Sequence, residues 1–432
     1  MSEKREMSAK EKFIRETIEF LQSDAATYYR RGDALHLDTV ALHGSKLLPL
    51  GGAELRAFLL RLGKLMNNVL LLRADAETII EHISYHAESV ARPLSKDARS
   101  MRDGGDILIN TGRENEVIRI TESGRWSVQP EARRLFEPLH ERMRMVIPEA
   151  SPATEFPDIL REGIADFGDR HCLIAVSCAT MMMPADSVHP FIVFTGDQSR
   201  GKSTTMTLLL RLIDPYEGSE LMTVGEDMRD LIALVRGRHS IALDNVSELP
   251  FEEDLLSKMY SGGMFAARKM TTNSELSEVE LPRLRVMMNG IGTSFTRSDL
   301  MSRCIFIEHP VLAKIVAGEE QFSSLSLVEK RWRGLLPRAL GSLLSGLAGG
   351  YKLFLDRGGY EGKTSCARFV EYAILGECIA EAMGFPPGMF TEQVTGSVQE
   401  QKEQAIDCDE AAGLNIIFFK GERTGGDVVM PF

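Results

Sequence analysis

The sequence lacks the features that mark secreted, membrane-spanning and zinc-binding proteins. No window approaches about 18 uninterrupted apolar residues, and residues 1–12 are polar and of mixed charge, so neither a spanning helix nor a signal peptide is indicated. The six cysteines form no CxxC pair, and the nine histidines show no HExxH or paired ligand spacing. We therefore expect a soluble, cytoplasmic protein with no membrane association, no disulfide framework and no zinc site.

Basic residues are in deficit. Lys plus Arg number 50 against 62 Asp plus Glu, which gives a formal net charge of −12. This balance argues against a generally basic protein that coats nucleic acid. It leaves room for a local basic groove.

Composition changes along the 432 residues divide the chain into four parts. Residues 1–150 begin with helical periodicity and continue with the short runs ILIN, VIRIT and RWSVQ, which predict a small antiparallel sheet and hence an α+β domain of unknown role. The segment PEASPATEFP predicts a boundary, because three prolines disfavour helix and sheet. We expect a core at 158–313, a helical region at 314–396 and a tail at 397–432.

The core alternates apolar runs with helical patterns. The runs are FIVFT at 191–195, SIALD at 240–244 and RVMMN at 285–289. Strands that alternate with helices indicate an α/β fold with a parallel sheet.

A glycine-bearing loop with the spacing GxxxxGKS follows the first of these strands and precedes an apolar helix. Backbone N–H groups in such a loop, at a helix N-terminus, cradle a triphosphate. We expect Lys202 to reach the outer phosphates of ATP and the Ser203 hydroxyl to bind Mg²⁺. A chance glycine-rich turn is the alternative. The residues expected to bind the nucleotide are Gly196, Asp197, Gln198, Ser199, Arg200, Gly201, Lys202, Ser203 and Thr204.

An acid that holds the magnesium ion is expected at the end of a neighbouring strand. Asp244 occupies this place after the run SIAL, although a strand that ends in Asp is common without any function. Asn245 follows, where many ATPases carry a glutamate that activates water. Either the chain binds ATP without turning it over, or another residue polarises the water, and Glu248 is the neighbour in sequence.

The order of phosphate loop, LDN, MNGI and TRSDLMSRCIFIE resembles the ATPase core of superfamily 3 helicases, which are members of the AAA+ class. Polyomavirus large T antigens in that class also place Asn after the Asp. The segments VSELP, SGGMFAARKMTTNSE and VMMNGIGTSFTRSDLMSR are similar to primase-helicase-like ATPases of phages and integrative elements. The resemblance implies a helical and β part before the ATPase core and a helical part after it.

The resemblance also implies roles for two further residues. Asn289, at the end of RVMMN, looks like the sensor that orients the attacking water, although Asn before Gly is also a favoured turn pair. Arg303 resembles the arginine finger that such ATPases insert into a neighbouring subunit's site. An ordinary surface arginine is the alternative, and Arg297 is the nearest competitor. A finger that acts in trans requires a homo-oligomer, and we expect a ring.

Two segments are candidates for contact with nucleic acid. The run MFAARKMTTNSELSEVEL reads as a β-hairpin, and in the resembling helicases a hairpin here carries basic side chains to single-stranded DNA, for which Arg268 and Lys269 are the candidates. A solvated basic pair on an edge strand is the alternative. Trp126 and its neighbouring arginines in the N-terminal sheet could also contact nucleic acid, but such a tryptophan is more often core.

The interpretation that unites these signals is an ATP-dependent, Mg²⁺-dependent DNA helicase or translocase that acts in the replication of a phage or mobile element. One alternative is an ATP-gated switch or loader that binds a replication partner and hydrolyses slowly. Another is a small-molecule phosphotransferase that uses the same loop.

Overall fold

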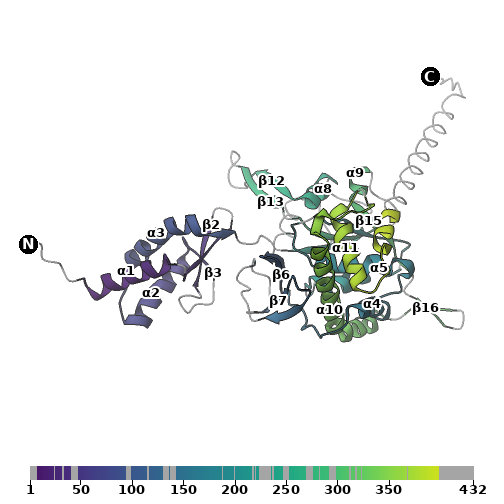
Figure 1. The fold of residues 1–432 in the computed structure, drawn as a ribbon, viewed down its shortest axis with the longest axis horizontal. Coiled ribbons are helices and arrows are strands. Elements are labelled where there is room, and N and C mark those ends of the chain that lie inside the picture. The colour runs from purple at the N-terminus through teal and green to yellow at the C-terminus, as the bar shows by residue number, and fades with distance from the viewer. Residues whose placement is uncertain are drawn as a thin grey trace, which may run out of the picture. The chain divides into compact units, whose positions relative to one another are not determined.

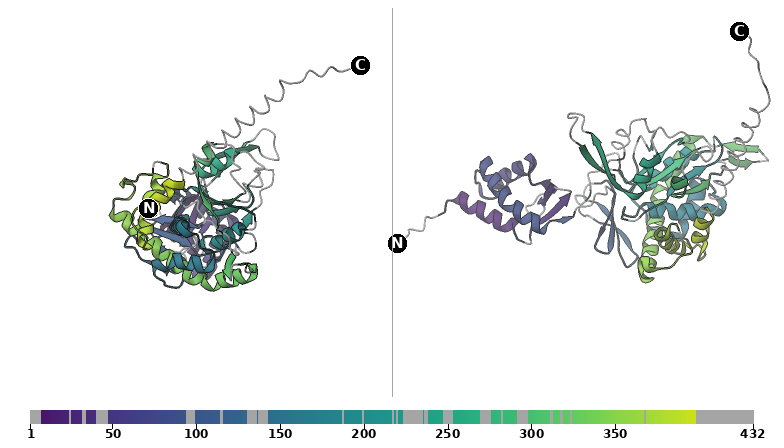
Figure 2. Two further views of the ribbon diagram at one scale, coloured as in Figure 1. Left: turned by 90° about the vertical axis from the view of Figure 1, so that its right-hand side faces the viewer. Right: turned by 90° about the horizontal axis from the view of Figure 1, so that it is seen from above.

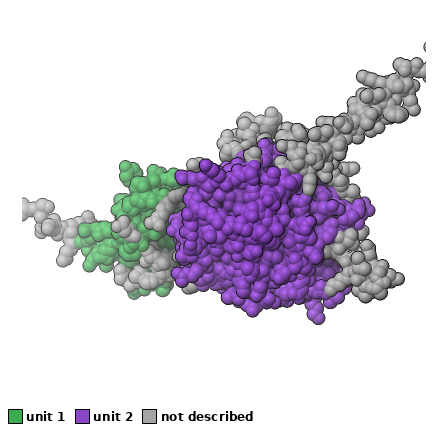
Figure 3. Space-filling view, turned by 45° about the vertical axis from the view of Figure 1, so that its right-hand side comes forward, with its two compact units in different colours: residues 1–98, 132–138 green, residues 99–131, 139–432 purple. Residues whose placement is uncertain are grey.

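The chain forms two compact units, residues 1–98 with 132–138, and residues 99–131 with 139–432 (Figure 1, Figure 3). In the computed structural model the described residues are 7–23, 25–31, 34–39, 47–93, 99–113, 116–129, 136, 143–186, 188–198, 200–216, 218, 220–222, 235, 238–246, 253–268, 276–281, 283–290, 298–310, 313–316, 319–322, 324–366 and 368–397.

The first unit packs three helices against a small mixed sheet, with strand order β3-β2-β1-β4. The side chain of Ser8 and that of Glu11 cap the first helix reciprocally, which satisfies backbone N–H groups at its start. The buried Tyr28 donates its hydroxyl to the carbonyl of Leu21, 2.8 Å away, and so ties strand to helix. The elements are α1 (Ala9–Leu21), β1 (Thr27–Arg31), β2 (Ala34–Asp38), β3 (Leu47–Pro49), α2 (Ala53–Asn67), α3 (Arg73–Val90) and β4 (Arg92–Pro93).

The second unit is built on a five-stranded sheet whose strand order is β10-β11-β14-β9-β15, with every pairing parallel. The elements of the core are α4 (Phe156–Gly163), α5 (His171–Met181), β9 (Phe191–Thr195), α6 (Lys202–Ile213), β10 (Leu221–Met222), β11 (Ser240–Leu243), α8 (Glu253–Ser261), β14 (Arg285–Asn289), α9 (Ser298–Met301) and β15 (Cys304–Glu308). The first strand of this core therefore lies between the fourth and the fifth. This parallel core, with an α+β region before it and helices after it, confirms the predicted fold class.

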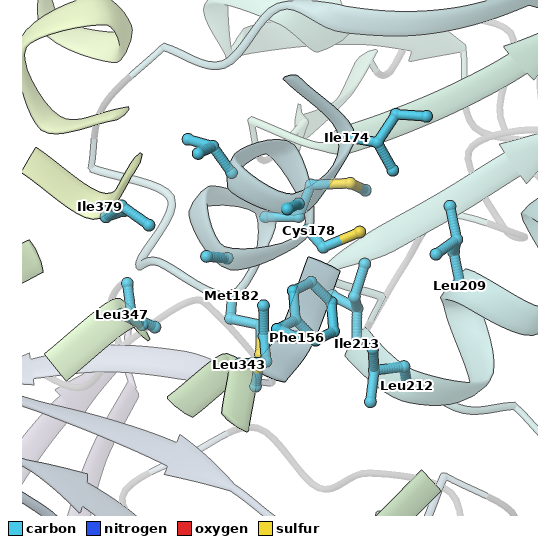
Figure 4. Close-up of a cluster of buried hydrophobic side chains, with 14 of the residues drawn as sticks. Phe156, Ile174, Cys178, Met182, Leu209, Leu212, Ile213, Leu343, Leu347 and Ile379 are labelled. Atoms are coloured by element: carbon cyan, nitrogen blue, oxygen red, sulfur yellow. The ribbon is translucent and has the colours of Figure 1, made fainter. Parts of the chain in front are cut away.

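Both faces of the sheet are buried. Alternation along β9 sends Ile192 and Phe194 into one hydrophobic cluster and Phe191 and Val193 into another. The first cluster contains α5, whose residues are all buried, because this helix is apolar on every side. Figure 4 shows side chains of this cluster gathered around α5. The labelled residues are Phe156, Ile174, Cys178, Met182, Leu209, Leu212, Ile213, Leu343, Leu347 and Ile379.

The predicted antiparallel sheet is present, but it belongs to the second unit. Its strands are β5 (Ser100–Asp103), β6 (Asp106–Asn110), β7 (Val117–Ile120) and β8 (Trp126–Gln129). Apolar side chains of β6 and β7 join the same cluster as α5, and Trp126 Nε1 donates to Ser345 Oγ at 3.0 Å. The division of the chain therefore differs from the expected domain of residues 1–150, because this sheet buries its apolar face against the core.

The C-terminal region begins with a hairpin of β16 (Ala313–Val316) and β17 (Glu319–Phe322). Two helices that pack against each other follow, α10 (Leu325–Asp356) and α11 (Val370–Ala382). They lie side by side in Figure 1, and both views of Figure 2 show them beside the core strands. Gly350 allows this approach, since a Cβ there would lie 2.5 Å from the Cα of Ile379. The helical region was predicted, and the hairpin at its start was not.

Candidate nucleotide site

The loop between β9 and α6 turns at two glycines in the left-handed region. Gly196 has φ +124° and Gly201 has φ +94°, which residues with a Cβ rarely adopt. Gly201 is the N-cap residue of α6, whose first N–H groups have no partner within the helix. Such a helix start favours an anion because the N–H groups and the positive end of the helix dipole act together.

Lys202 is the first residue of α6, and its ammonium group folds back onto the loop. Nζ donates to the carbonyl oxygens of Gly196 and Asp197, each at 2.6 Å. Partial burial, with the nearby Arg200 guanidinium, lowers the pKa of Lys202 below that of an ordinary lysine, against Asp197 and Asp244, which raise it. These carbonyls are neutral partners, so an anion in the loop could compete for the ammonium group.

Three polar side chains converge where neighbouring parallel strands end. Ser203 Oγ donates to Asp244 Oδ1 at 2.7 Å. Asn289 Nδ2 lies 2.7 Å from the same carboxylate oxygen and 2.9 Å from Ser203 Oγ. Asp244 follows β11 and Asn289 ends β14, and these strands pair directly. A hydroxyl and a carboxylate oxygen are ligands that Mg²⁺ accepts, so this donor set fits the ion.

The backbone of Asn245 fixes the orientation of the Asn289 amide. Asn245 N–H donates to Asn289 Oδ1 at 2.7 Å, which leaves Nδ2 to face Asp244 and Ser203. Asn245 itself has φ +55°, a conformation that Asn tolerates better than most residues with a side chain. The asparagine after Asp244 therefore suits its backbone, where a glutamate would be strained.

His309 lies on the inner side of the loop and belongs to no recognisable sequence motif. Its Nδ1 lies 2.6 Å from the carbonyl oxygen of Pro310, which can only accept, so Nε2 accepts from the Thr205 hydroxyl at 2.7 Å. Burial, together with Lys202 and Arg200, lowers the pKa of His309 to about 4. The imidazole is therefore neutral near pH 7 and supports α6 by a hydrogen bond.

Arg200 lies across the outside of the loop. It pairs with Asp197 at 2.5 Å and with Glu308 at 3.2 Å, and it donates to the His309 carbonyl at 3.3 Å. These contacts join the loop to the end of β15. Arg200 is among the residues predicted to bind the nucleotide, and the structure shows its side chain in contact with protein groups.

Arg303 lies away from this cluster. It precedes β15, at the amino edge of the sheet, whereas the loop follows the carboxyl end of the adjacent parallel β9. Its Nη1 donates to the Ser257 carbonyl at 3.0 Å, and its guanidinium lies 5.3 Å from the centre of the Tyr260 ring. The side chain is half-buried. Arg303 is therefore not part of its own chain's loop cluster.

The remaining predicted residues are placed as follows. Asp197 and Gln198 are exposed in the loop, and Thr204 lies in the first turn of α6. Arg268 ends β12 (Gly263–Arg268), which pairs antiparallel with β13 (Leu276–Leu281), so the expected hairpin is present. Four residues named in the predictions lie outside the described residues: Ser199, Glu248, Lys269 and Arg297. The side chain of Arg268 is not described either.

Among the residues that the structure describes, no group of three His, Cys, Asp or Glu side chains could hold a metal ion, so a Mg²⁺ ion would rely on Ser203, Asp244 and the nucleotide itself. No helix in the same ranges is long and apolar enough to cross a membrane.

Comparison with known proteins gives one family match. No curated protein matches the chain. Among solved structures, it is similar to the apo C-terminal region of NrS-1, at 13% identity over 89% of this chain and 94% of that one with a TM-score of 0.36, and to JCV helicase, at 14% identity over 54% and 66% with a TM-score of 0.26. Residues 163–348, less than half of the chain, match the family described as Actinomycete integrative conjugative element replication protein.

Proposed function

We propose that this chain is an ATPase that acts in the replication of a mobile element and couples hydrolysis to movement along single-stranded DNA. The observation that carries the proposal is the contact of Ser203, Asp244 and Asn289 beside a glycine-bounded helix start. The family match supports the replication role, because residues 163–348 contain the entire site.

The chain's own groups divide the work. The N–H groups at the start of α6 and the Lys202 ammonium would bind the phosphates, and Ser203 with Asp244 would hold Mg²⁺. Bound Mg²⁺-ATP supplies the anhydride bond whose cleavage by water gives ADP, phosphate and a proton. Asn289, fixed by the backbone of Asn245, presents Nδ2 toward the acid and would orient the water there.

The β12–β13 hairpin is the candidate contact with DNA. β12 ends at Arg268, and Lys269 follows directly in sequence. Cations at a hairpin tip bind the phosphate backbone without regard to base sequence. In a ring of identical subunits these tips would line one bore.

The test is ATP hydrolysis with and without single-stranded DNA. We expect hydrolysis by the wild-type chain to rise severalfold with DNA and to be lost in Lys202→Ala. The double substitution Arg268→Ala and Lys269→Ala should keep basal hydrolysis and lose the stimulation. Hydrolysis that ignores every nucleic acid would contradict the motor.

Asn245 favours a second candidate, an ATP-gated switch or loader with slow hydrolysis. The residue after the acid is an asparagine in a backbone conformation that disfavours glutamate. A switch should bind ATP tightly, hydrolyse it at the same slow rate with or without DNA, and displace no strand from a forked duplex. A motor should displace the strand.

A further inference from the structure

A second arginine lies beside Arg303 at the amino edge of the core sheet. Arg368, in the segment before α11, donates from Nε to the carbonyl of Ser302 at 2.9 Å and from Nη2 to its hydroxyl at 2.6 Å. Ser302 directly precedes Arg303 in the chain, so the Arg368 side chain reaches the backbone next to Arg303 although the two arginines are far apart in sequence. Two hydrogen bonds to one residue fix the plane of the Arg368 fork.

Both arginines act on the same ring. Burial raises the pKa of Tyr260, Arg368 and Arg303 both lower it, and Cys304 and Glu371 raise it. Arg303 also lies over the face of that ring. The two cations therefore share one small region of the surface.

Neither cation has an ion-pair partner among the described residues, although the Glu371 carboxylate also acts on Tyr260. The contacts of Arg303 are the Ser257 carbonyl and the Tyr260 ring, and those of Arg368 are both to Ser302. Arg368 is exposed and Arg303 is half-buried. Two nearby positive charges repel each other, and these two lack ion-pair partners in the described part of the chain, although the chain as a whole has a net charge of −12. Such a pair is suited to an anion that arrives from outside.

The chain's own nucleotide site is too far away to supply that anion. Arg303 precedes β15 and the phosphate loop follows the parallel strand β9. β15 has five residues, so the two edges of the sheet are about 15 Å apart. An anion that meets both arginines must belong to another molecule.

We propose that Arg368 and Arg303 together enter the nucleotide site of a neighbouring copy of this chain and contact its terminal phosphate. A single guanidinium fork can donate to two oxygens of a phosphate, and a second fork adds a further positive charge and further donors for the remaining oxygen. This inference rests on the proposed ATPase function and adds Arg368, a residue from the C-terminal helical region, to the site.

The experiment compares ATP hydrolysis by Arg368→Ala, by Arg303→Ala and by the matched control Arg333→Ala, an exposed arginine on α10. We expect Arg368→Ala to bind a fluorescent ATP analogue within about threefold of wild type and to hydrolyse ATP about tenfold or more slowly. Arg333→Ala should hydrolyse at the wild-type rate. Retained nucleotide binding shows that the variant is folded.

Mixing distinguishes action in trans from action in cis. Arg368→Ala and Lys202→Ala chains, carrying different tags and recovered as mixed oligomers, should regain activity, because about a quarter of their interfaces pair an intact loop with intact arginines. Wild-type hydrolysis by Arg368→Ala alone, or a loss that mixed oligomers do not restore, overturns the inference. A wild-type chain that hydrolyses ATP as a monomer overturns it as well.

The two proposals fail differently. Absence of hydrolysis by the wild-type chain contradicts the ATPase itself. Hydrolysis that depends on Lys202 and Arg303 but not on Arg368 leaves the ATPase standing and removes only the second arginine.

Discussion

Asn289 is held in one orientation by its neighbours, and this makes its chemistry predictable. Its amide oxygen accepts from the Asn245 backbone, and its amide nitrogen faces Asp244 Oδ1 at 2.7 Å. An aspartate at this position would place a second carboxylate oxygen against the first.

We therefore predict that Asn289→Asp lowers ATP hydrolysis by about 100-fold while nucleotide binding changes little. Asn289→Ala removes the same hydrogen bonds without adding a charge, so its loss of hydrolysis should be smaller. Steady-state hydrolysis and analogue binding measure the two quantities. Equal rates for the Asp and Ala variants would show that charge repulsion is not the cause.

His309, again a single residue, is expected to make the unfolding free energy depend on pH. The pKa of His309 is about 4 in the folded chain and about 6.5 in an unfolded one, so the unfolded state binds more protons between these values. The contribution of His309 to the unfolding free energy is fully present above pH 6.5 and is lost as the pH falls toward 4.

We expect His309→Gln to reduce the change in the unfolding free energy between pH 7 and pH 5 by about 2 kcal/mol. The comparison must be made against wild type, because His171 and His189 also have lowered pKa values. Urea titrations at pH 7 and pH 5 measure the difference. A variant with the same pH dependence as wild type would mean that His309 titrates normally.

At the scale of elements, two glycines of α10 allow the effect of close packing on stability to be distinguished from the effect of helix propensity. A Cβ at Gly350 would lie 2.5 Å from the Ile379 backbone of α11, whereas a Cβ at Gly334 would meet nothing within 4 Å. The first must push two helices apart, and the second only stiffens an exposed turn.

Gly350→Ala should therefore destabilise the chain by about 1–3 kcal/mol, and Gly334→Ala should stabilise it by about 0.5–1 kcal/mol. Chemical denaturation of the two variants checks both signs. The same sign for both substitutions would contradict the close packing of α10 on α11.

The strands and helices around the candidate site also differ in how far they could be predicted from the sequence. The glycine-bearing loop and the helix after it could be predicted because strand, glycines, Lys202 and helix lie within one short segment. Asp244 and Asn289 were predicted as site residues from their places at strand ends. The pairing of β11 with β14 brings these residues together, and no local pattern reveals it.

The residues that prediction missed are those joined by long-range contacts. His309 meets Thr205 across 104 residues, and Arg368 meets Ser302 across 66. A single histidine or arginine has no periodicity or spacing to mark it. The strands β1 to β4 of the first unit were also missed, since runs such as TYYRR and ALHLD are short and carry charged or polar side chains.

At the scale of the whole second unit, a buried ion pair joins the small sheet to the core. Arg99 and Asp214 lie 2.7 Å apart, and both side chains are only 1% exposed. Arg99 also donates to the carbonyls of Asn110 and Met143, and the other oxygen of Asp214 accepts from the Ser240 N–H. This pair explains why residues 99–131 belong with the core.

Arg99→Ala should destabilise the second unit by about 3–5 kcal/mol, because it leaves a buried carboxylate without its cation. Arg119→Ala is the matched control on the same sheet, since its pairs with Asp103 and Asp106 are partly exposed and should contribute about 1 kcal/mol or less. Thermal unfolding monitors both. A small effect of Arg99→Ala would show that the sheet is held by apolar packing alone.

The central claim is that the carboxyl edge of this sheet binds Mg²⁺-ATP, and calorimetric titration tests it most directly. We predict that the wild-type chain binds ATP more tightly with Mg²⁺ than without it, that Lys202→Ala weakens binding about tenfold or more, and that Asp244→Asn removes the effect of Mg²⁺. Binding that is equal in all three proteins, or that ignores Mg²⁺ in the wild-type chain, would contradict the account.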